Sequence, residues 1–271
     1  MLKQRIITAL LLLPVALAGF FLLEGVAFAL FIGAVITLGA WEWAQLAGFA
    51  GQRQRCLYAA LVALLCGLLY GLPWLAWAVL LLAVAWWGVA TLLVMSYPQS
   101  SGYWASPRVR LLIGLLVLLP AWQGLVVIKQ MPQANALILA VMILVWGADI
   151  GAYFAGRAFG KRKLAPRVSP GKSWEGVFGG LLLCLVLALA LGLYQGWAAG
   201  QLLALLAGTL VVVLVSVVGD LNESMFKRQA GLKDSSNLLP GHGGVLDRID
   251  SLTAAVPLFA VLLRLSGWGA A

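Results

Sequence analysis

The chain has 271 residues, of which 63% are hydrophobic and 10% charged, and its formal net charge is +9. Soluble domains contain about 45–50% apolar residues, so this composition excludes an ordinary soluble domain. In a membrane protein a positive charge is typical of basic cytoplasmic loops, and nucleic acid is not an expected partner. The three cysteines show neither a disulfide pattern nor metal-ligand spacing, so a disulfide scaffold and a zinc site are not expected.

Apolar runs of about 20 residues, the length that a helix needs to cross a bilayer, recur along the chain. They predict an all-α, polytopic integral membrane protein, because a closed barrel would show short alternating segments instead. About nine transmembrane helices are expected, at residues 6–23, 26–49, 56–71, 74–96, 110–128, 135–156, 175–196, 201–223 and 246–266. The first is expected to remain as an uncleaved helix, since no small-residue cleavage site precedes a soluble domain.

The lysines and arginines support this arrangement of spans. With nine spans, the N-terminus and the even-numbered loops lie on one side, together with every base except Lys129 and Arg264. The positive-inside rule makes that side cytoplasmic, so a cytoplasmic N-terminus is predicted. Residues 1–130 then form an N-terminal region with spans 1–5, and residues 131–271 a C-terminal catalytic region with cytoplasmic loops at 157–174 and 224–246. Lys129 lies on the opposite side, and its replacement by Gln is expected to cost little.

Acidic residues within the spans gather near the cytoplasmic ends. Glu42, Asp149 and Asp220 lie within about eight residues of these ends, or about 12 Å at 1.5 Å per residue. Asp247 and Asp250 begin the ninth span at the same depth. A carboxylate inside a span costs about 2.5–3.5 kcal/mol and usually faces a water-filled cavity. We therefore expect one polar cavity that opens to the cytoplasm.

The acids of the last two spans have the chemistry of a divalent metal site. Asp220 and Glu223 share one face of the eighth span, and Asp220 meets Asp247 if the intervening loop folds back. Carboxylates in a wet pocket suit hard cations such as Mg²⁺. The alternative is that these acids form buried structural ion pairs with Arg228 and Arg248.

The basic loop before the seventh span contains Ser169-Pro-Gly-Lys-Ser173. It brings a lysine, two hydroxyls and backbone amides to the start of a helix, where phosphate groups bind. Gly171-Lys172-Ser173 resembles the end of a P-loop, but Pro166 occupies the earlier glycine position and no strand is expected before it. A P-loop fold is therefore rejected. The alternative to phosphate binding is a topology determinant that contacts anionic lipid.

Residues 224–250 form the densest polar cluster and contain the only histidine, His242, within Pro240-Gly-His-Gly-Gly244. A lone histidine between glycines is most often a loop hydrogen-bonding residue, with metal binding and acid–base catalysis as alternatives. Gly241, Gly243 and Gly244 are expected to allow positive φ or the close approach of a ligand. Protease and zinc-enzyme motifs are absent from the sequence. Acids for a metal ion and bases for phosphates favour phosphoryl chemistry at a membrane surface.

Several of these motifs together resemble one known family. Ser224–Asp250 contains Ser-x-x-Lys-Arg, Lys-Asp, Pro-Gly-His-Gly-Gly and Asp-Arg-x-Asp, and Ser169–Gly176 is similar to Ser-Pro-Lys-Lys-Thr/Ser-x-Glu-Gly, with Gly171 where lysine is common. Asp149–Gly156 and the Trp41-Glu-Trp motif also look similar. The chain thus resembles the phosphatidate cytidylyltransferases, or CDP-diacylglycerol synthases, over most of its length.

This resemblance implies that CTP and phosphatidic acid react to give CDP-diacylglycerol and pyrophosphate for phospholipid biosynthesis. It implies a metal centre with Mg²⁺, and K⁺ as a second ion, whose ligands are Asp220, Asp247, Asp149 and Asp250. The catalytic residues implied are Asp220, Asp247, Lys227 and Lys233. The substrate-binding residues implied are Ser169, Lys172, Ser173, Ser224, Arg228, His242 and Arg248. A homodimer in the lipid bilayer of the bacterial cytoplasmic (inner) membrane is also implied, multi-pass and with its active site facing the cytoplasm.

Two other functions are compatible with intramembrane acids. A cation-coupled transporter would keep such acids near a cavity, but it predicts inverted repeats and broken helices in both halves. The acids here crowd toward the C-terminal half instead. Another CTP-using membrane enzyme, such as a polyprenol kinase, is the closer alternative, and product analysis distinguishes it.

Overall fold

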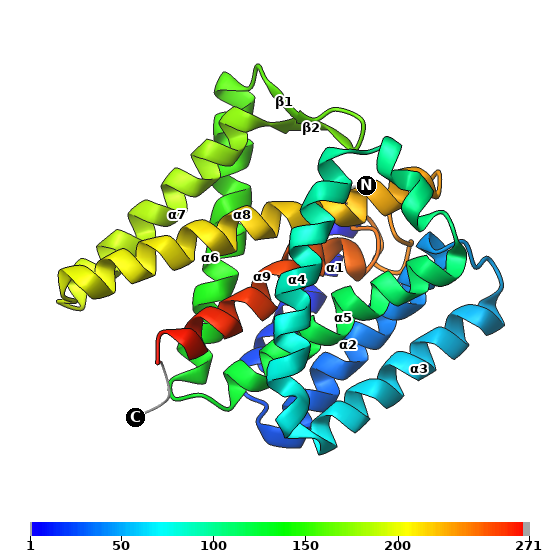
Figure 1. Cartoon of the computed structure of the whole chain (residues 1–271), viewed down its shortest axis with the longest axis horizontal. Coiled ribbons are helices and arrows are strands. Elements are labelled where there is room, and N and C mark those ends of the chain that lie inside the picture. The colour runs from blue at the N-terminus through cyan, green and yellow to red at the C-terminus, as the bar shows by residue number, and fades with distance from the viewer. Residues whose placement is uncertain (1, 268–271) are drawn as a thin grey trace.

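The computed structural model describes residues 2–267, with side chains described at residue 8 and from residue 10 onward. The side chains of Lys3 and Arg5, which the sequence places at a cytoplasmic N-terminus, lie outside this part. Within residues 2–267 the chain forms nine α-helices and one β-hairpin (Figure 1). The helices are α1 (Leu2–Phe21), α2 (Gly25–Leu46), α3 (Gln52–Gly71), α4 (Ala76–Met95), α5 (Pro107–Lys129), α6 (Ala134–Phe159), α7 (Trp174–Tyr194), α8 (Ala199–Gln229) and α9 (Leu246–Leu265).

Each predicted span is a helix, and the protein is a multi-pass membrane protein. Among the described residues, seven helices are long and apolar enough to cross a membrane, namely those from α2 to α8. The described apolar part of α1 is the shorter segment Leu10–Phe21. α9 is not among the seven, and it contains Asp247, Arg248, Asp250 and Arg264. The predicted count of nine spans is therefore not established by helix length and composition.

Helices α5 and α9 lie at the centre of the bundle. α9 packs against α8, α5 and α4, and α5 also packs against α2. In the most apolar window of α5, 67% of residues are buried, as expected for a helix that is apolar on all sides. The Trp122 indole of α5 donates to the Ala29 carbonyl of α2 (3.0 Å), so its one polar atom is satisfied inside the core.

Helices α6 and α7 form a closely packed pair beside this core (Figure 1). A Cβ atom at Gly151 of α6 would lie 2.8 Å from the Gly179 carbonyl oxygen of α7, so small residues allow the two backbones to approach. The connection between them is an antiparallel hairpin of β1 (Lys163–Ala165) and β2 (Ser169–Ser173). This hairpin was not predicted from the sequence, because its strands are short and lack alternating apolar residues.

Lys129, at the end of α5, is a buried structural residue. Its Nζ atom donates to the Phe20 carbonyl (3.1 Å) and to Asn135 Oδ1 (2.6 Å), and it lies 3.1 Å from Glu24 Oε1. Only 7% of the residue is exposed. It therefore links the end of α1 to the connection between α5 and α6. The expectation that replacing Lys129 costs little does not extend to the stability of the protein.

Lys129→Ala is expected to lower the free energy of unfolding by about 1–3 kcal/mol, because it removes the hydrogen bonds that the charged, buried ammonium donates to the Phe20 carbonyl and to Asn135. Activity per folded molecule should stay near the wild-type level, since Lys129 lies at the end of α5 opposite Arg110. Thermal unfolding in detergent, with turnover measured on the same sample, checks both parts. An unchanged melting temperature would contradict the structural role.

Candidate functional site

Loops that are far apart in the sequence meet at one end of the bundle. The hairpin β1–β2 and the α8–α9 loop lie at the same end in Figure 1. Arg228 Nε, at the end of α8, donates to the Val168 carbonyl of the hairpin turn (3.1 Å). Thr8 Oγ1, in α1, donates to the Pro240 carbonyl of the α8–α9 loop (3.0 Å). The two predicted polar loops therefore belong to one site region.

Asp220 and Lys172 form an ion pair at a partly open edge of this region. Lys172 Nζ lies 2.6 Å from Asp220 Oδ2, and the Ser224 hydroxyl donates to Asp220 Oδ1 (3.3 Å). Both side chains are about a quarter exposed, 28% for Lys172 and 26% for Asp220. Asp149, an exposed residue of α6, lies within electrostatic range of both. A ligand from solution can therefore reach this pair.

Asp247, in the first turn of α9, is held from several directions. Its Oδ1 atom accepts from Lys227 Nζ (2.6 Å). Its Oδ2 atom accepts from the backbone and hydroxyl of Ser235 (2.9 and 2.8 Å) and from the Gly244 amide (2.8 Å). The side chain is only 6% exposed. The α8–α9 loop thus folds back onto Asp247, which was the condition for Asp220 to meet Asp247, but the two acids pair with different lysines.

Lys227 joins the acids of α8 to those of α9. Besides Asp247, it contacts Glu223 Oε1 (3.0 Å), while Glu223 Oε2 is buried with no hydrogen-bond partner among the described residues. Asp250 lies within electrostatic range of Lys227, Lys172 and Asp220. We call this group the carboxylate–lysine cluster: Asp220, Glu223, Asp247, Asp250, Lys172 and Lys227. Its paired bases are lysines, and not Arg228 and Arg248 as in the alternative considered from the sequence.

Glu42 supports the cluster from behind and does not face a water-filled cavity, which corrects the sequence-based interpretation. It is fully buried and accepts hydrogen bonds from the Ser236 hydroxyl (2.5 Å) and from the amides of Val245 (2.9 Å) and Leu246 (2.6 Å). The Ser235 hydroxyl lies 3.2 Å from Glu42 and shares its single proton between Glu42 and Asp247. The first amides of a helix lack intrahelical partners, and Glu42 satisfies those at the start of α9. The sequence alone does not reveal this contact, because Glu42 in α2 is 193 and 194 residues away from Ser235 and Ser236 in the chain.

A polar cavity of about 440 Å³ lies in the α8–α9 loop. Its lining includes Lys233, His242 and Arg248, three of the predicted site residues, and also Asp234. His242 Nδ1 is buried without a partner among the described residues. Gly243, at φ +85°, lines the cavity and lies against Asp247, since a Cβ atom there would be 2.8 Å from Asp247 Oδ2. The cavity therefore adjoins the carboxylate–lysine cluster.

The predicted phosphate loop lies on a strand, and this overturns one expectation. Ser169 begins β2, Lys172 lies within it, and Ser173 both ends it and caps α7, its hydroxyl accepting from the Gly176 amide (3.2 Å). A strand therefore precedes the helix. It belongs to an antiparallel hairpin and not to a parallel βαβ unit, so the rejection of a P-loop is unaffected. The Ser173 hydroxyl acts in helix capping.

The donor chemistry of the cluster fits Mg²⁺ bound together with a substrate. Its acidic members present only carboxylate oxygens, the ligands that Mg²⁺ prefers. Among the described residues, no three acids, imidazoles or thiols converge on one metal position. Mg²⁺ is commonly held by one or two carboxylates plus substrate phosphates, and such a site needs no third protein ligand.

A glycine sets the contact between α8 and α9 beneath the cluster. A Cβ atom at Gly219 would lie 2.7 Å from the Asp250 carbonyl oxygen and 2.9 Å from Ala254 Cβ. Since Gly219 precedes Asp220, this close approach sets the position of Asp220 relative to α9. Gly208, in the same helix, offers a matched comparison, because its nearest atom would be Leu262 Cδ1 at 3.9 Å.

Gly219→Ala is expected to lower the free energy of unfolding by about 1–3 kcal/mol, the usual cost of overpacking, and to reduce turnover by displacing Asp220. Gly208→Ala should leave both properties close to wild type. Chemical or thermal unfolding in detergent, alongside product formation, tests the pair. Equal behaviour of the two variants would contradict the proposed contact.

Comparison with known proteins gives matches over the full length. Residues 3–266 match the model of the Cytidylyltransferase family. A Pseudomonas aeruginosa protein named phosphatidate cytidylyltransferase is 71% identical, with 100% of both chains covered. Proteins of the same name from Haemophilus influenzae and Brucella suis are 46% and 37% identical, covering 96% and 95% of this chain and 98% and 91% of their own.

Proposed function

Because this chain belongs to the cytidylyltransferase family, we propose that it transfers the cytidylyl group of CTP to phosphatidic acid. A phosphate oxygen of the lipid attacks the α-phosphorus of CTP, the bond from that phosphorus to the β-phosphate oxygen breaks, and CDP-diacylglycerol and pyrophosphate result. The observation that carries the proposal is the full-length match, at 71% identity, to a relative named phosphatidate cytidylyltransferase. The chemistry of the carboxylate–lysine cluster supports it.

The cluster is proposed as the catalytic centre. Asp220 and Asp247 are the proposed holders of Mg²⁺, with Asp149 and Asp250 as further ligands and K⁺ as a second ion. Bound there, Mg²⁺ would supply neutralisation of phosphate charge. Lys172 lies at the open edge, where its ammonium can bind a phosphate oxygen of either substrate. Lys227 fixes the orientation of the Asp247 carboxylate through the 2.6 Å contact.

The bases of the loop cavity are proposed to bind the remaining phosphates of CTP. Lys233 and Arg248 line a space of about 440 Å³ next to Asp247, and His242 presents an unpartnered Nδ1 atom among the described residues. Ser169, Ser224 and Arg228 lie around the same region, although Arg228 is already engaged with the Val168 carbonyl. Fixed cations of this kind stabilise the charge that develops during phosphoryl transfer.

In the proposed topology, the chain crosses the bacterial inner membrane nine times. Its N-terminus and its active site both face the cytoplasm. The distribution of bases supports this topology, since all but Lys129 and Arg264 fall on the predicted cytoplasmic side. CTP then arrives from water and phosphatidic acid from the inner leaflet. A homodimer is part of the proposal, and the mass of the protein in detergent tests it.

The decisive experiment gives the purified chain labelled CTP, Mg²⁺ and phosphatidic acid in detergent. Stoichiometric CDP-diacylglycerol and pyrophosphate are expected, and omission of Mg²⁺ should abolish both. A lipid kinase would instead release CDP and a phosphorylated lipid. That product pattern, or no reaction of phosphatidic acid across salts and divalent ions, would overturn the proposal.

A further inference from the structure

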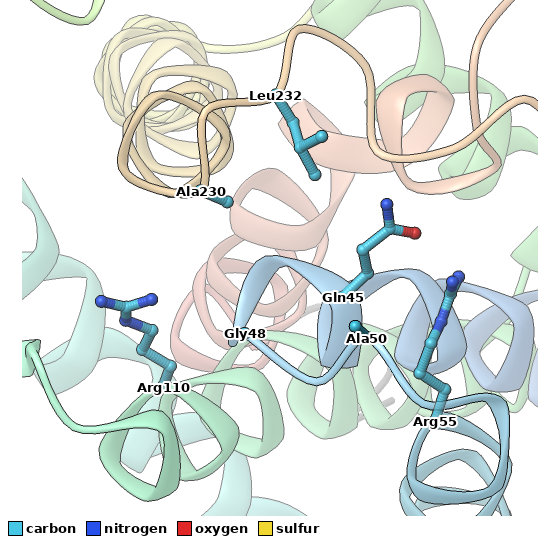
Figure 2. Close-up of a pocket in the computed structure, with 7 residues that line it drawn as sticks. All are labelled: Gln45, Gly48, Ala50, Arg55, Arg110, Ala230 and Leu232. Carbon is cyan, nitrogen blue, oxygen red and sulfur yellow. The ribbon is translucent and has the colours of Figure 1, made fainter.

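A second cavity, with two arginines in its lining, lies at the same end of the bundle, between turns that the proposed reaction does not use. It has a volume of about 330 Å³ and is lined by Gln45, Gly48, Ala50, Arg55, Arg110, Ala230 and Leu232. Figure 2 shows the two arginines on either side of the turn that carries Gly48 and Ala50, with Ala230 and Leu232 across the cavity. The lining contains two guanidinium groups and no acid.

Backbone caps at two helix ends build facing walls of this cavity. After α2, the Phe49 amide donates to the Ala44 carbonyl, with Gly48 at φ +101°. After α8, the Leu232 amide likewise donates to the Lys227 carbonyl. This pattern satisfies carbonyl oxygens that would otherwise repel an anion. Both walls are therefore fixed in shape, and their capped carbonyl oxygens do not compete for the arginines.

Arg55 and Arg110 are held in place by one nitrogen each. Arg55 Nε donates to the Trp41 carbonyl (3.1 Å), and Arg110 Nε donates to the Trp104 carbonyl (3.1 Å). The Arg55 guanidinium also stacks on the Trp41 ring, 3.4 Å from its centroid. The Nε hydrogen bond thus orients each guanidinium, and the terminal nitrogens do not take part in that bond.

One terminal nitrogen of Arg55 lacks a hydrogen-bond partner within the part of the chain that the structure describes. Arg55 is only 8% exposed, and its Nη2 atom is buried with no hydrogen-bond partner among the described residues. Glu42 acts on Arg55 electrostatically, but both of its oxygens already accept hydrogen bonds from the α8–α9 loop and the start of α9. Leaving a buried charged donor unpaired is costly, so this nitrogen indicates a missing acceptor.

We propose that this arginine cavity binds a phosphate group, separate from the carboxylate–lysine cluster. Arginine presents a planar fork of donors that matches phosphate oxygens, and both arginines lie in the first turn of a helix, α3 and α5, where the helix dipole also favours an anion. The group can belong to a lipid headgroup or to a free anion such as pyrophosphate. Binding is measured without turnover, so the outcome does not depend on the proposed reaction.

The test compares the full chain in detergent with Arg55→Gln/Arg110→Gln. Native mass spectrometry with phosphatidic acid, and with diacylglycerol as the lipid that lacks phosphate, measures the lipid arm. Calorimetry with inorganic pyrophosphate measures the free-anion arm. In Arg55→Gln/Arg110→Gln, the affinity for either phosphatidic acid or pyrophosphate should fall about tenfold or more, because charge-assisted hydrogen bonds to the phosphate are lost. The arm that responds identifies the source of the phosphate.

Matched variants separate the site from general charge and from folding. Arg53→Gln/Arg108→Gln removes the same charge at exposed positions of the same helix turns and should bind within about twofold of wild type. Gln45→Glu keeps both arginines but puts a carboxylate in the cavity, and it should weaken the same event. Asp220→Asn should leave this event intact. The proposal would be overturned if Gln45→Glu and Arg55→Gln/Arg110→Gln both bound phosphatidic acid and pyrophosphate as tightly as the Arg53→Gln/Arg108→Gln control.

Discussion

Asp220→Asn is expected to lower kcat/KM for CDP-diacylglycerol synthesis by about 10- to 100-fold or more, since the loss of a residue that only supports a metal ligand already costs about 10–100-fold. The side chain keeps its shape, but it loses the charge that holds Lys172 at 2.6 Å. In the proposed mechanism it also loses a ligand for Mg²⁺. Since Asp220 is about a quarter exposed, its ion pair contributes little to stability, and the melting temperature should stay near wild type. Pyrophosphate release and thermal unfolding in detergent measure the two quantities.

Glu24→Gln supplies the matched control for this variant. It makes the same chemical change at the opposite end of the bundle, on a side chain that is 67% exposed, and should retain wild-type activity. Lys172→Gln should resemble Asp220→Asn, and the double variant should lose less than the product of the two single effects, because the residues act as a pair. If Asp220→Asn kept more than a tenth of wild-type kcat/KM, the assignment of Asp220 to the centre would be wrong.

The helices could be predicted from the sequence because their signal is a sum over many residues. A run of about 20 apolar residues leaves helix as the favoured way to satisfy the backbone in lipid. Helix ends depend on fewer residues and were predicted less well. The eighth span was expected to end at 223, whereas α8 continues to Gln229. The polar residues of this extra turn include Lys227, which pairs with the acids of α8 and α9 inside the protein.

The candidate site was predictable only in part, since charge in an apolar chain identifies residues but not their partners. Asp220 and Asp247 stand out in the sequence, and the structure gives each a lysine partner. Ser235, fully buried, joins Glu42 to Asp247, yet a serine in a polar loop carries no signal of its own. The hairpin around Lys172 also lacks a periodic pattern, and contacts with α7 and α8 position its second strand, β2.

Glu42→Gln is expected to have the largest effect on stability, lowering the free energy of unfolding by about 3 kcal/mol or more. Hydrogen bonds to charged groups contribute about 1.5–3 kcal/mol each, and glutamine turns one acceptor into a donor that faces other donors. Glu42 accepts from the Ser236 hydroxyl and from the amides of Val245 and Leu246, and it shares the Ser235 hydroxyl with Asp247. Activity should fall as well, because the same loop holds Asp247 through Ser235 and Gly244. Thermal unfolding and turnover in detergent give the two readouts.

Two serines allow the supporting role of Glu42 to be separated from the role of Asp247. Ser236 donates its hydroxyl only to Glu42 among the hydrogen bonds of the described residues, whereas the Ser235 hydroxyl contacts both Glu42 and Asp247. Ser236→Ala should therefore reduce stability with kcat close to wild type, and Ser235→Ala should reduce both. If both serine variants kept wild-type kcat, Glu42 and its loop would act on stability alone, and the link from α2 through Ser235 to the carboxylate–lysine cluster would have no part in turnover.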